Sequence, residues 1–137
     1  MSAQDLITGL SNQLNREVTT FLRSMQQGAV IKGAPWQSVR EMYRNEVGDE
    51  VGHAQYLADQ IVMLGGALKL QPDLSAPPAD VREMLLNDVR EEQTDVANYA
   101  RLAVLAEKEG LLALKMKMEE QAADEDAHRQ EMQRLLG

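Results

Sequence analysis

Cysteine is absent from the 137-residue sequence, which excludes both a disulfide framework and a metal site built on thiolates. Long apolar runs are absent as well, so no segment reaches the length of a membrane span. The first residues lack the basic and apolar regions of a signal peptide. A reducing compartment fits this composition best, and we expect a cytoplasmic protein that does not contact membranes.

Aromatic and basic residues are scarce. Aromatic residues make up 4% of the chain, so the core must be mostly aliphatic, with the eight methionines as gap fillers. Fourteen Lys and Arg stand against 22 Asp and Glu, and the formal net charge of −8 argues against nucleic-acid binding while it favours cations. The length, with 44% hydrophobic and 26% charged residues, indicates one globular domain spanning residues 1–137.

Histidine occurs only twice, each time at the end of an Asp-Glu-x-x-His motif. The motifs run from Asp49 to His53 and from Asp124 to His128. On a helix, positions i and i+3 lie about one turn apart on the same face. The motif glutamate and histidine can therefore point a carboxylate and an imidazole at one spot, which is an ordinary way to bind a transition metal.

The spacing of the acids indicates an internal repeat. The interval from Glu17 to Glu50 equals the interval from Glu92 to Glu125, and the shift that carries His53 onto His128 superposes the two halves of the chain. Apolar residues align under the same shift, which we call the repeat shift. The aligned pairs are Leu10 with Leu85, Leu14 with Val89, Phe21 with Val96, Val39 with Leu114, Tyr43 with Met118, Leu57 with Met132 and Ile61 with Leu136.

These patterns predict an all-α, four-helix bundle made of two antiparallel helical hairpins. Residues 65 to about 77 show no helical period, and they are long enough to run along the bundle as a crossover. Met25 extends the apolar stripe of the first helix. The predicted boundary residues are Ser2 with Asp5 as a capping box, Pro35, Gly65-Gly66, Pro77-Pro78 and Gly110.

Six side chains would project into the bundle interior. Buried empty, four carboxylates would cost several kcal/mol or more each, whereas two divalent cations would balance their four negative charges. Oxygen and nitrogen ligands without thiolate suit iron or manganese, and zinc stays open. The predicted metal ligands and catalytic residues are Glu17, Glu50, His53, Glu92, Glu125 and His128.

The aspartates of the two motifs are predicted to orient the histidines across the bundle, since metal-bound imidazoles usually donate their other N–H to an acceptor. We expect Asp49 to face His128 and Asp124 to face His53. Gly48 and Gly52, with Ala123 and Ala127 in the second copy, are expected to let the second and fourth helices approach closely.

Four further side chains near the motifs have alternative interpretations. Glu91 is assigned to solvent, because only its neighbour in the sequence shares the apolar stripe. Glu46 either guides cations or is a surface acid, and Asp95 is a candidate extra ligand. Tyr99 is either a core tyrosine or a hydrogen-bond donor to a ligand.

The six ligand positions, both Asp-Glu-x-x-His motifs and the crossover resemble the ferritin-like superfamily, and bacterioferritin most of all. The stretch Met84-Leu85-Leu86-Asn87-Asp88 is similar to its third helix. The resemblance implies a ferroxidase that binds two Fe(II) ions and oxidises them with O₂ or H₂O₂. It also implies iron storage in a homo-oligomer, at least a dimer. In the family pattern the two motif glutamates are bridging or paired ligands, the other two glutamates are terminal, and each iron takes one histidine.

Three features depart from bacterioferritin. Val51 stands where that family carries a haem-ligating methionine, so haem is not expected. Ser24 replaces the tyrosine of the first helix, while Tyr99 lies at the pseudo-equivalent place. The sequence stops at Gly137 without the short fifth helix of 24-subunit cages, so a dimer or a smaller shell stays open.

Two other classes of function stay open. One is a different di-metal oxidoreductase, such as a rubrerythrin-like peroxidase, a manganese catalase-like enzyme or a hydroxylase, with manganese or mixed metals as cofactor. Asp95 as a seventh ligand would favour the rubrerythrin-like enzyme. The other class is a metal-stabilised binding or scaffolding bundle without turnover.

Overall fold

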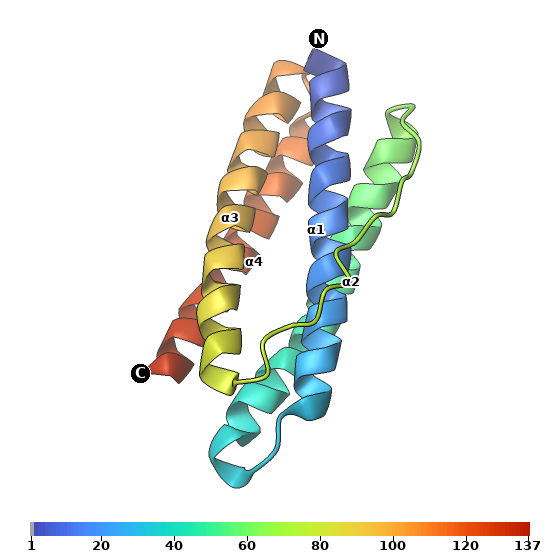
Figure 1. The fold of residues 1–137 in the computed structure, drawn as a ribbon. Coiled ribbons are helices and arrows are strands. Elements are labelled where there is room, and N and C mark those ends of the chain that lie inside the picture. Colours follow the sequence, from blue (N-terminus) through green and yellow to red (C-terminus); the bar gives the residue numbers. More distant parts are fainter. Residues whose placement is uncertain (1) are drawn as a thin grey trace.

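Residues 2–137 form four long helices in two hairpins, as the sequence predicts (Figure 1). The computed structural model describes residues 2–137, and the side chain of Ser2, with its predicted capping role, lies outside the described part. The first hairpin joins α1 to α2 and the second joins α3 to α4, and none of the described helices is long and apolar enough to cross a membrane. The elements are α1 Ser2–Val30, the 3₁₀ turn η1 Ala34–Trp36, α2 Gln37–Met63, α3 Val81–Lys108 and α4 Leu112–Leu136.

Glycines with positive φ end two of the helices where the sequence predicts it. Gly65, at φ 89°, follows α2, and Gly110, at φ 73°, follows α3. The predicted start of α3 at Pro77-Pro78 is wrong. The helix begins at Val81 because the Asp80 side chain accepts a hydrogen bond from the Glu83 backbone N–H at 3.1 Å, which makes Asp80 the N-cap.

Pro35 lies within η1, so α2 itself starts at Gln37. Residues 67–78 have no regular structure and pass alongside α1, with the bundle behind them (Figure 1). The predicted crossover between the hairpins is therefore confirmed.

Two apolar clusters fill the bundle, one on each side of a polar middle. The residues that align under the repeat shift supply much of both clusters, and Tyr43 and Met118 are each fully buried. Phe21 and Val96 are only partly buried, and Met25 is 53% exposed, so its predicted place in the core is wrong. The face of α1 that points into the polar middle of the bundle is itself polar. It carries the buried residues Glu17, Thr20, Ser24 and Gln27.

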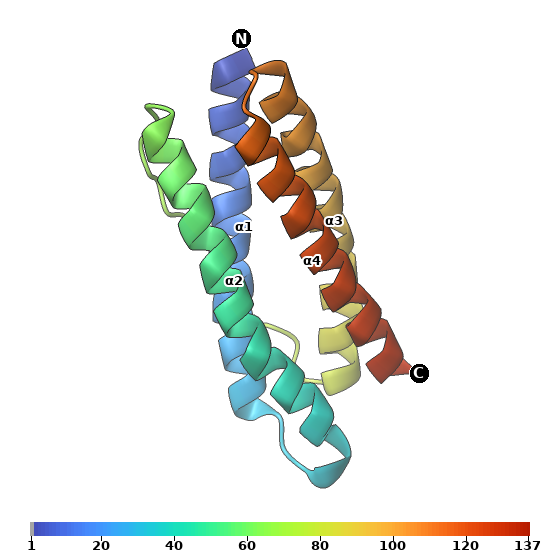
Figure 2. The same ribbon diagram turned by 180° about the vertical axis from the view of Figure 1, so that it is seen from behind.

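Ion pairs join α1 to α3 along one side of the bundle. Arg16 Nε lies 2.6 Å from Asp95 Oδ1, and Arg23 Nε lies 2.7 Å from Asp88 Oδ1. Both aspartates are almost fully buried. On the opposite side α2 and α4 run side by side but apart, and they make few contacts (Figure 2). The bundle is therefore held closely on the α1–α3 side and is open on the α2–α4 side.

Candidate metal centre

All six predicted ligands meet in the polar middle of the bundle, one or two from each helix. Two overlapping groups of four place one ligand atom from each residue within 4.8 Å of all the others. The first group is Glu17, Glu50, His53 and Glu125. The second group is Glu46, Glu50, Glu92 and His128. The predicted convergence is observed, while metal binding by these residues stays a prediction.

His53 directs its Nδ1 atom into the cluster. This atom lies 3.1 Å from Glu17 Oε2, 3.2 Å from Glu125 Oε1 and 3.7 Å from Glu50 Oε1. Its Nε2 atom lies 3.2 Å from Asp124 Oδ2. The predicted contact between this imidazole and the aspartate of the other motif is confirmed.

His128 repeats this arrangement in the second half. Its Nδ1 atom lies 2.8 Å from Glu46 Oε1 and between 3.6 and 3.8 Å from oxygens of Glu50, Glu92 and Glu125. Its Nε2 atom lies 3.2 Å from Asp49 Oδ2, as predicted. Each Nδ1 is thus available to a cation, and an aspartate holds the ring through the other nitrogen.

The buried polar atoms fit a pair of divalent cations. Within residues 2–137, both carboxylate oxygens of Glu50 and of Glu125 are buried without a hydrogen-bond partner. The same is true, in this part of the chain, of one oxygen each of Glu17, Glu46 and Glu92 and of His128 Nδ1. Buried polar groups in proteins are normally paired, so this concentration of unpaired ligand atoms needs a counter-charge. A set of oxygen and nitrogen donors suits iron or manganese.

The pKa shifts of the ligand residues have the same cause, the burial of many carboxylates close to two imidazoles. Burial, followed by the charge of Glu17, raises the pKa of Glu50 well above its usual value, and burial also raises that of Glu92. Burial would lower the pKa of both imidazoles, but hydrogen bonds to glutamates outweigh it and raise the pKa of His53 to about 10 and of His128 to about 11. Without metal, therefore, protons neutralise much of the cluster.

Glu46 belongs to the centre, so the interpretation as a surface acid is wrong. It is 3% exposed, and one of its oxygens is the nearest carboxylate atom to His128 Nδ1. The sequence signal was its position one turn before Glu50, which places both side chains on the same helix face.

Tyr99 donates a hydrogen bond to Glu17 Oε2 at 2.5 Å, and its ring packs edge-on against His53 at 6.1 Å between centroids. The sharper of its two interpretations, a donor to a candidate ligand, is confirmed. Its hydroxyl fixes one oxygen of the carboxylate and leaves the other, Oε1, without a partner in the described chain.

Asp95 lies beside the centre but is held from outside. Its Oδ1 atom accepts hydrogen bonds from Gln13 Nε2 at 2.9 Å and from Arg16 Nε at 2.6 Å. Burial, and next the charge of Glu17, raises the pKa of Asp95 to about 7, although Arg16 opposes the shift. Glu91 points away from the centre and pairs with Arg16 at 3.0 Å, consistent with its assignment outside the site.

An open groove between α2 and α4 leads to both histidines. It has a volume of about 720 Å³ and is lined by Gly48, Gly52 and Ala127 as well as by both imidazoles. A Cβ atom added at either glycine would meet no described atom within 4 Å. The prediction that small residues bring these helices together is wrong. They widen a groove through which small ions can reach the imidazoles.

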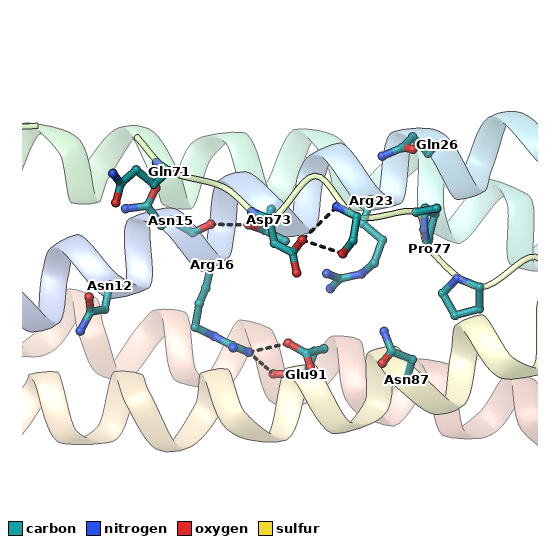
Figure 3. Close-up of a pocket in the computed structure, with 14 residues that line it drawn as sticks. Asn12, Asn15, Arg16, Arg23, Gln26, Gln71, Asp73, Pro77, Asn87 and Glu91 are labelled. Carbon is teal, nitrogen blue, oxygen red and sulfur yellow. Dashed lines mark hydrogen bonds and ion pairs between the residues drawn. The ribbon is translucent and has the colours of Figure 1, made fainter. Parts of the chain in front are cut away.

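A second pocket, of about 420 Å³, lies between α1, α3 and the crossover (Figure 3). Arg16 reaches Glu91 and Arg23 binds Asp88, while Asp73 Oδ1 accepts hydrogen bonds from Ser75. The backbone N–H of Asp73 donates to Thr19 Oγ1 at 2.9 Å, which ties the crossover to α1. These paired charges distinguish the pocket from the cluster of unpaired ligand atoms in the bundle core.

Comparisons with known proteins agree with this geometry. The family model described as a ferritin-like domain matches residues 7–137. A solved structure titled ferritin like, diiron-carboxylate proteins, from Bacillus anthracis str. Ames, is 31% identical with a TM-score of 0.95, over 100% of this chain and 99% of that chain. No curated protein sequence matches.

More distant structures share the fold. A Mycobacterium tuberculosis bacterioferritin is 21% identical with a TM-score of 0.86, covering 97% of this chain and 84% of that one. A dodecameric thioferritin from Bacteroides fragilis is 23% identical with a TM-score of 0.84, covering 98% and 85%. On the family match across nearly its whole length and on the likeness to the diiron-carboxylate structure, the chain belongs to the ferritin-like family.

Proposed function

We propose that the protein binds two Fe(II) ions in the bundle core and oxidises them to Fe(III) with O₂ or H₂O₂. The observation that supports this is the set of buried carboxylate oxygens that have no hydrogen-bond partner in the described chain and face two imidazole Nδ1 atoms. Two Fe(II) ions supply the two electrons that reduce O₂ to H₂O₂, or H₂O₂ to water.

The chain's own residues have separate tasks in this proposal. Glu50 and Glu125 lie between the two histidines and would be shared by both ions, whereas Glu17 and Glu92 would each bind one ion. The aspartates of the motifs keep each Nε2 occupied, so that Nδ1 carries the free lone pair. The α2–α4 groove would admit iron and oxidant.

The test is to add Fe(II) without oxygen, then admit O₂ and follow both Fe(III) absorbance and particle size. Rapid oxidation with a growing mineral supports iron storage, and stoichiometric oxidation that stops without a mineral supports a redox enzyme. Oxidation no faster than in protein-free buffer refutes the proposal. Glu50→Gln should abolish the rapid phase, whereas Glu41→Gln, an exposed acid on the same helix, should leave it intact.

A di-metal peroxidase is the second candidate, and one oxygen of Asp95 favours it. Oδ2 is buried, has no partner in the described residues, and Asp95 can join Glu92 and Glu125 in a third group of ligand atoms. The same oxidation assay, with H₂O₂ in place of O₂, distinguishes the peroxidase from the ferroxidase. A rate with H₂O₂ far above that with O₂, lost in Asp95→Asn, would support the peroxidase.

We also propose a cytoplasmic homo-oligomer. Several large apolar side chains are exposed on the crossover and at the end of α2, among them Leu70 at 60%, Leu74 at 73% and Met63 at 79%. The Bacteroides fragilis relative is described as dodecameric. Light scattering coupled to size exclusion should give at least a dimer, and a monomer at micromolar concentration would contradict the proposal. Fractionation of cells of the source organism tests the location.

A further inference from the structure

The two halves of the centre differ in charge at the buried pair Glu46 and Gln121. The repeat shift matches each of the six predicted ligands to an identical residue type in the other half. It matches Glu46, however, to Gln121. Both side chains are buried, at 3% and 1% exposure, so a carboxylate stands in one half where a neutral amide stands in the other.

Glu46 lies against the candidate position beside His128. Its Oε1 atom is 2.8 Å from His128 Nδ1, and Oε2 is buried with no partner among the described residues. A carboxylate oxygen and an imidazole nitrogen this close together can both bind one cation once the imidazole has lost its proton.

Gln121 and His53 both line the α2–α4 groove, and the repeat shift places Gln121 relative to His53 as Glu46 is placed relative to His128. Both polar atoms of its amide are buried and lack a partner in the part of the chain described here. The position beside His53 therefore faces a neutral group. Tyr99 should weaken cation binding at this position further, because its hydroxyl already donates a hydrogen bond to Glu17 Oε2.

Asp95, a buried acid beside the centre, also lacks an acidic counterpart, but it does not change this comparison. Asp95 aligns with Thr20 under the repeat shift, but Arg16 and Gln13 already bind its Oδ1 atom. An ion-paired carboxylate contributes little net charge to either position, so the imbalance comes from Glu46.

We propose that the two cation positions are unequal, with the one beside His128 filled first because Glu46 adds a carboxylate to it, and the one beside His53, facing Gln121, filled second. The inference rests on the proposed di-metal centre. It expects affinities that differ by about 10- to 100-fold, the range measured when a partner of a metal site is removed.

The test is an anaerobic titration of the metal-free protein with Co(II), followed by calorimetry and by the ligand-field absorption of the bound ion. The wild type should bind two ions in two separate steps. Glu46→Gln should weaken the first step about 10-fold or more and merge the two. Gln121→Glu should strengthen the second binding step and so reduce the difference in affinity between the two cation positions. Glu41→Gln should change neither.

Crystals grown with one equivalent of Co(II) locate the first ion directly by anomalous scattering, which should place it within bonding distance of His128 Nδ1. First occupancy beside His53 would overturn the inference, as would two indistinguishable steps in the wild type. These results would leave the proposed function standing. Failure of the wild type to bind Co(II), Fe(II) or Mn(II) would remove both. If Glu46→Gln does not fold, the Gln121→Glu titration and the crystals still decide.

Discussion

Replacing Glu50 by methionine should stabilise the metal-free protein while removing its response to metal. Glu50 is fully buried, and both its carboxylate oxygens lack a hydrogen-bond partner in the described chain. Its neighbours Glu17, Glu92 and Glu125 repel it, and with burial they raise its pKa. Methionine has a similar unbranched shape and no charge. Replacing a whole buried ion pair by apolar residues of similar volume is often neutral or stabilising by about 1–4 kcal/mol, and here the acids outnumber the two imidazoles, so the loss of one acid leaves no cation unpaired.

We expect about 2 kcal/mol, near the middle of that range, because Glu50 also lies 3.7 Å from His53 Nδ1 and some attraction is lost. For a chain of this size the gain raises Tm by about 6 °C. Urea denaturation in EDTA measures it. A metal present at about 100 times its Kd stabilises the wild type by about 2.7 kcal/mol per site, so adding Mn(II) should reverse the order of stability.

Glu41→Met is the matched control, since Glu41 is exposed on the same helix and its replacement should stay within about 0.5 kcal/mol under both conditions. Two results would refute the reasoning. If metal-free Glu50→Met were less stable than the wild type by more than about 1 kcal/mol, the carboxylate would be well satisfied without metal. If Mn(II) stabilised the variant as much as the wild type, Glu50 would not be a ligand.

Three further predictions concern the histidines and the groove. Asp124→Asn should weaken metal binding beside His53 by about 10- to 100-fold in a Co(II) titration, and an unchanged isotherm would contradict the orienting role. Metal binding at pH 7 should release protons, because the imidazole pKa values, raised to about 10 and about 11, keep both rings protonated without metal. The affinity for metal should therefore rise with pH. Calorimetry in buffers of different ionisation enthalpy should detect the released protons. Gly52→Ala, in a helix facing open space, should stabilise by about 0.5–1 kcal/mol, whereas Gly65→Ala, equally open but at φ 89°, should destabilise; equal signs in urea denaturation would contradict this.

The repeat explains why so much of the centre was predictable from sequence. Two Glu-x-x-His motifs, each with a glutamate at the same distance upstream, fix which helix faces must meet. The same pseudo-symmetry predicts that each motif aspartate faces the opposite histidine, and the contacts of Asp49 and Asp124 confirm it. Periodicity and symmetry carry this information because both are properties of the helices themselves.

The errors arose where an outcome depends on how the hairpins pack. Glu46 lies on the same helix face as Glu50. An acid one turn from a ligand is buried, however, only where a neighbouring helix covers it. Gly48 and Gly52 are compatible with either a close helix contact or a gap. The separation of α2 from α4 decides between these, and no residue pattern within one helix encodes it.

The opposite side of the bundle is held together by ion pairs. The pairs Arg16–Asp95 and Arg23–Asp88 hold α1 and α3 together, and each contains an aspartate that is almost fully buried. Breaking such a pair leaves an uncompensated buried charge at a cost of about 3–5 kcal/mol, so this side resists opening. The unpaired acids of the centre lie in the bundle core, and the groove between α2 and α4 leads to the two histidines beside them. A cation can thus reach the imidazoles through the groove without disturbing the ion pairs that hold α1 to α3.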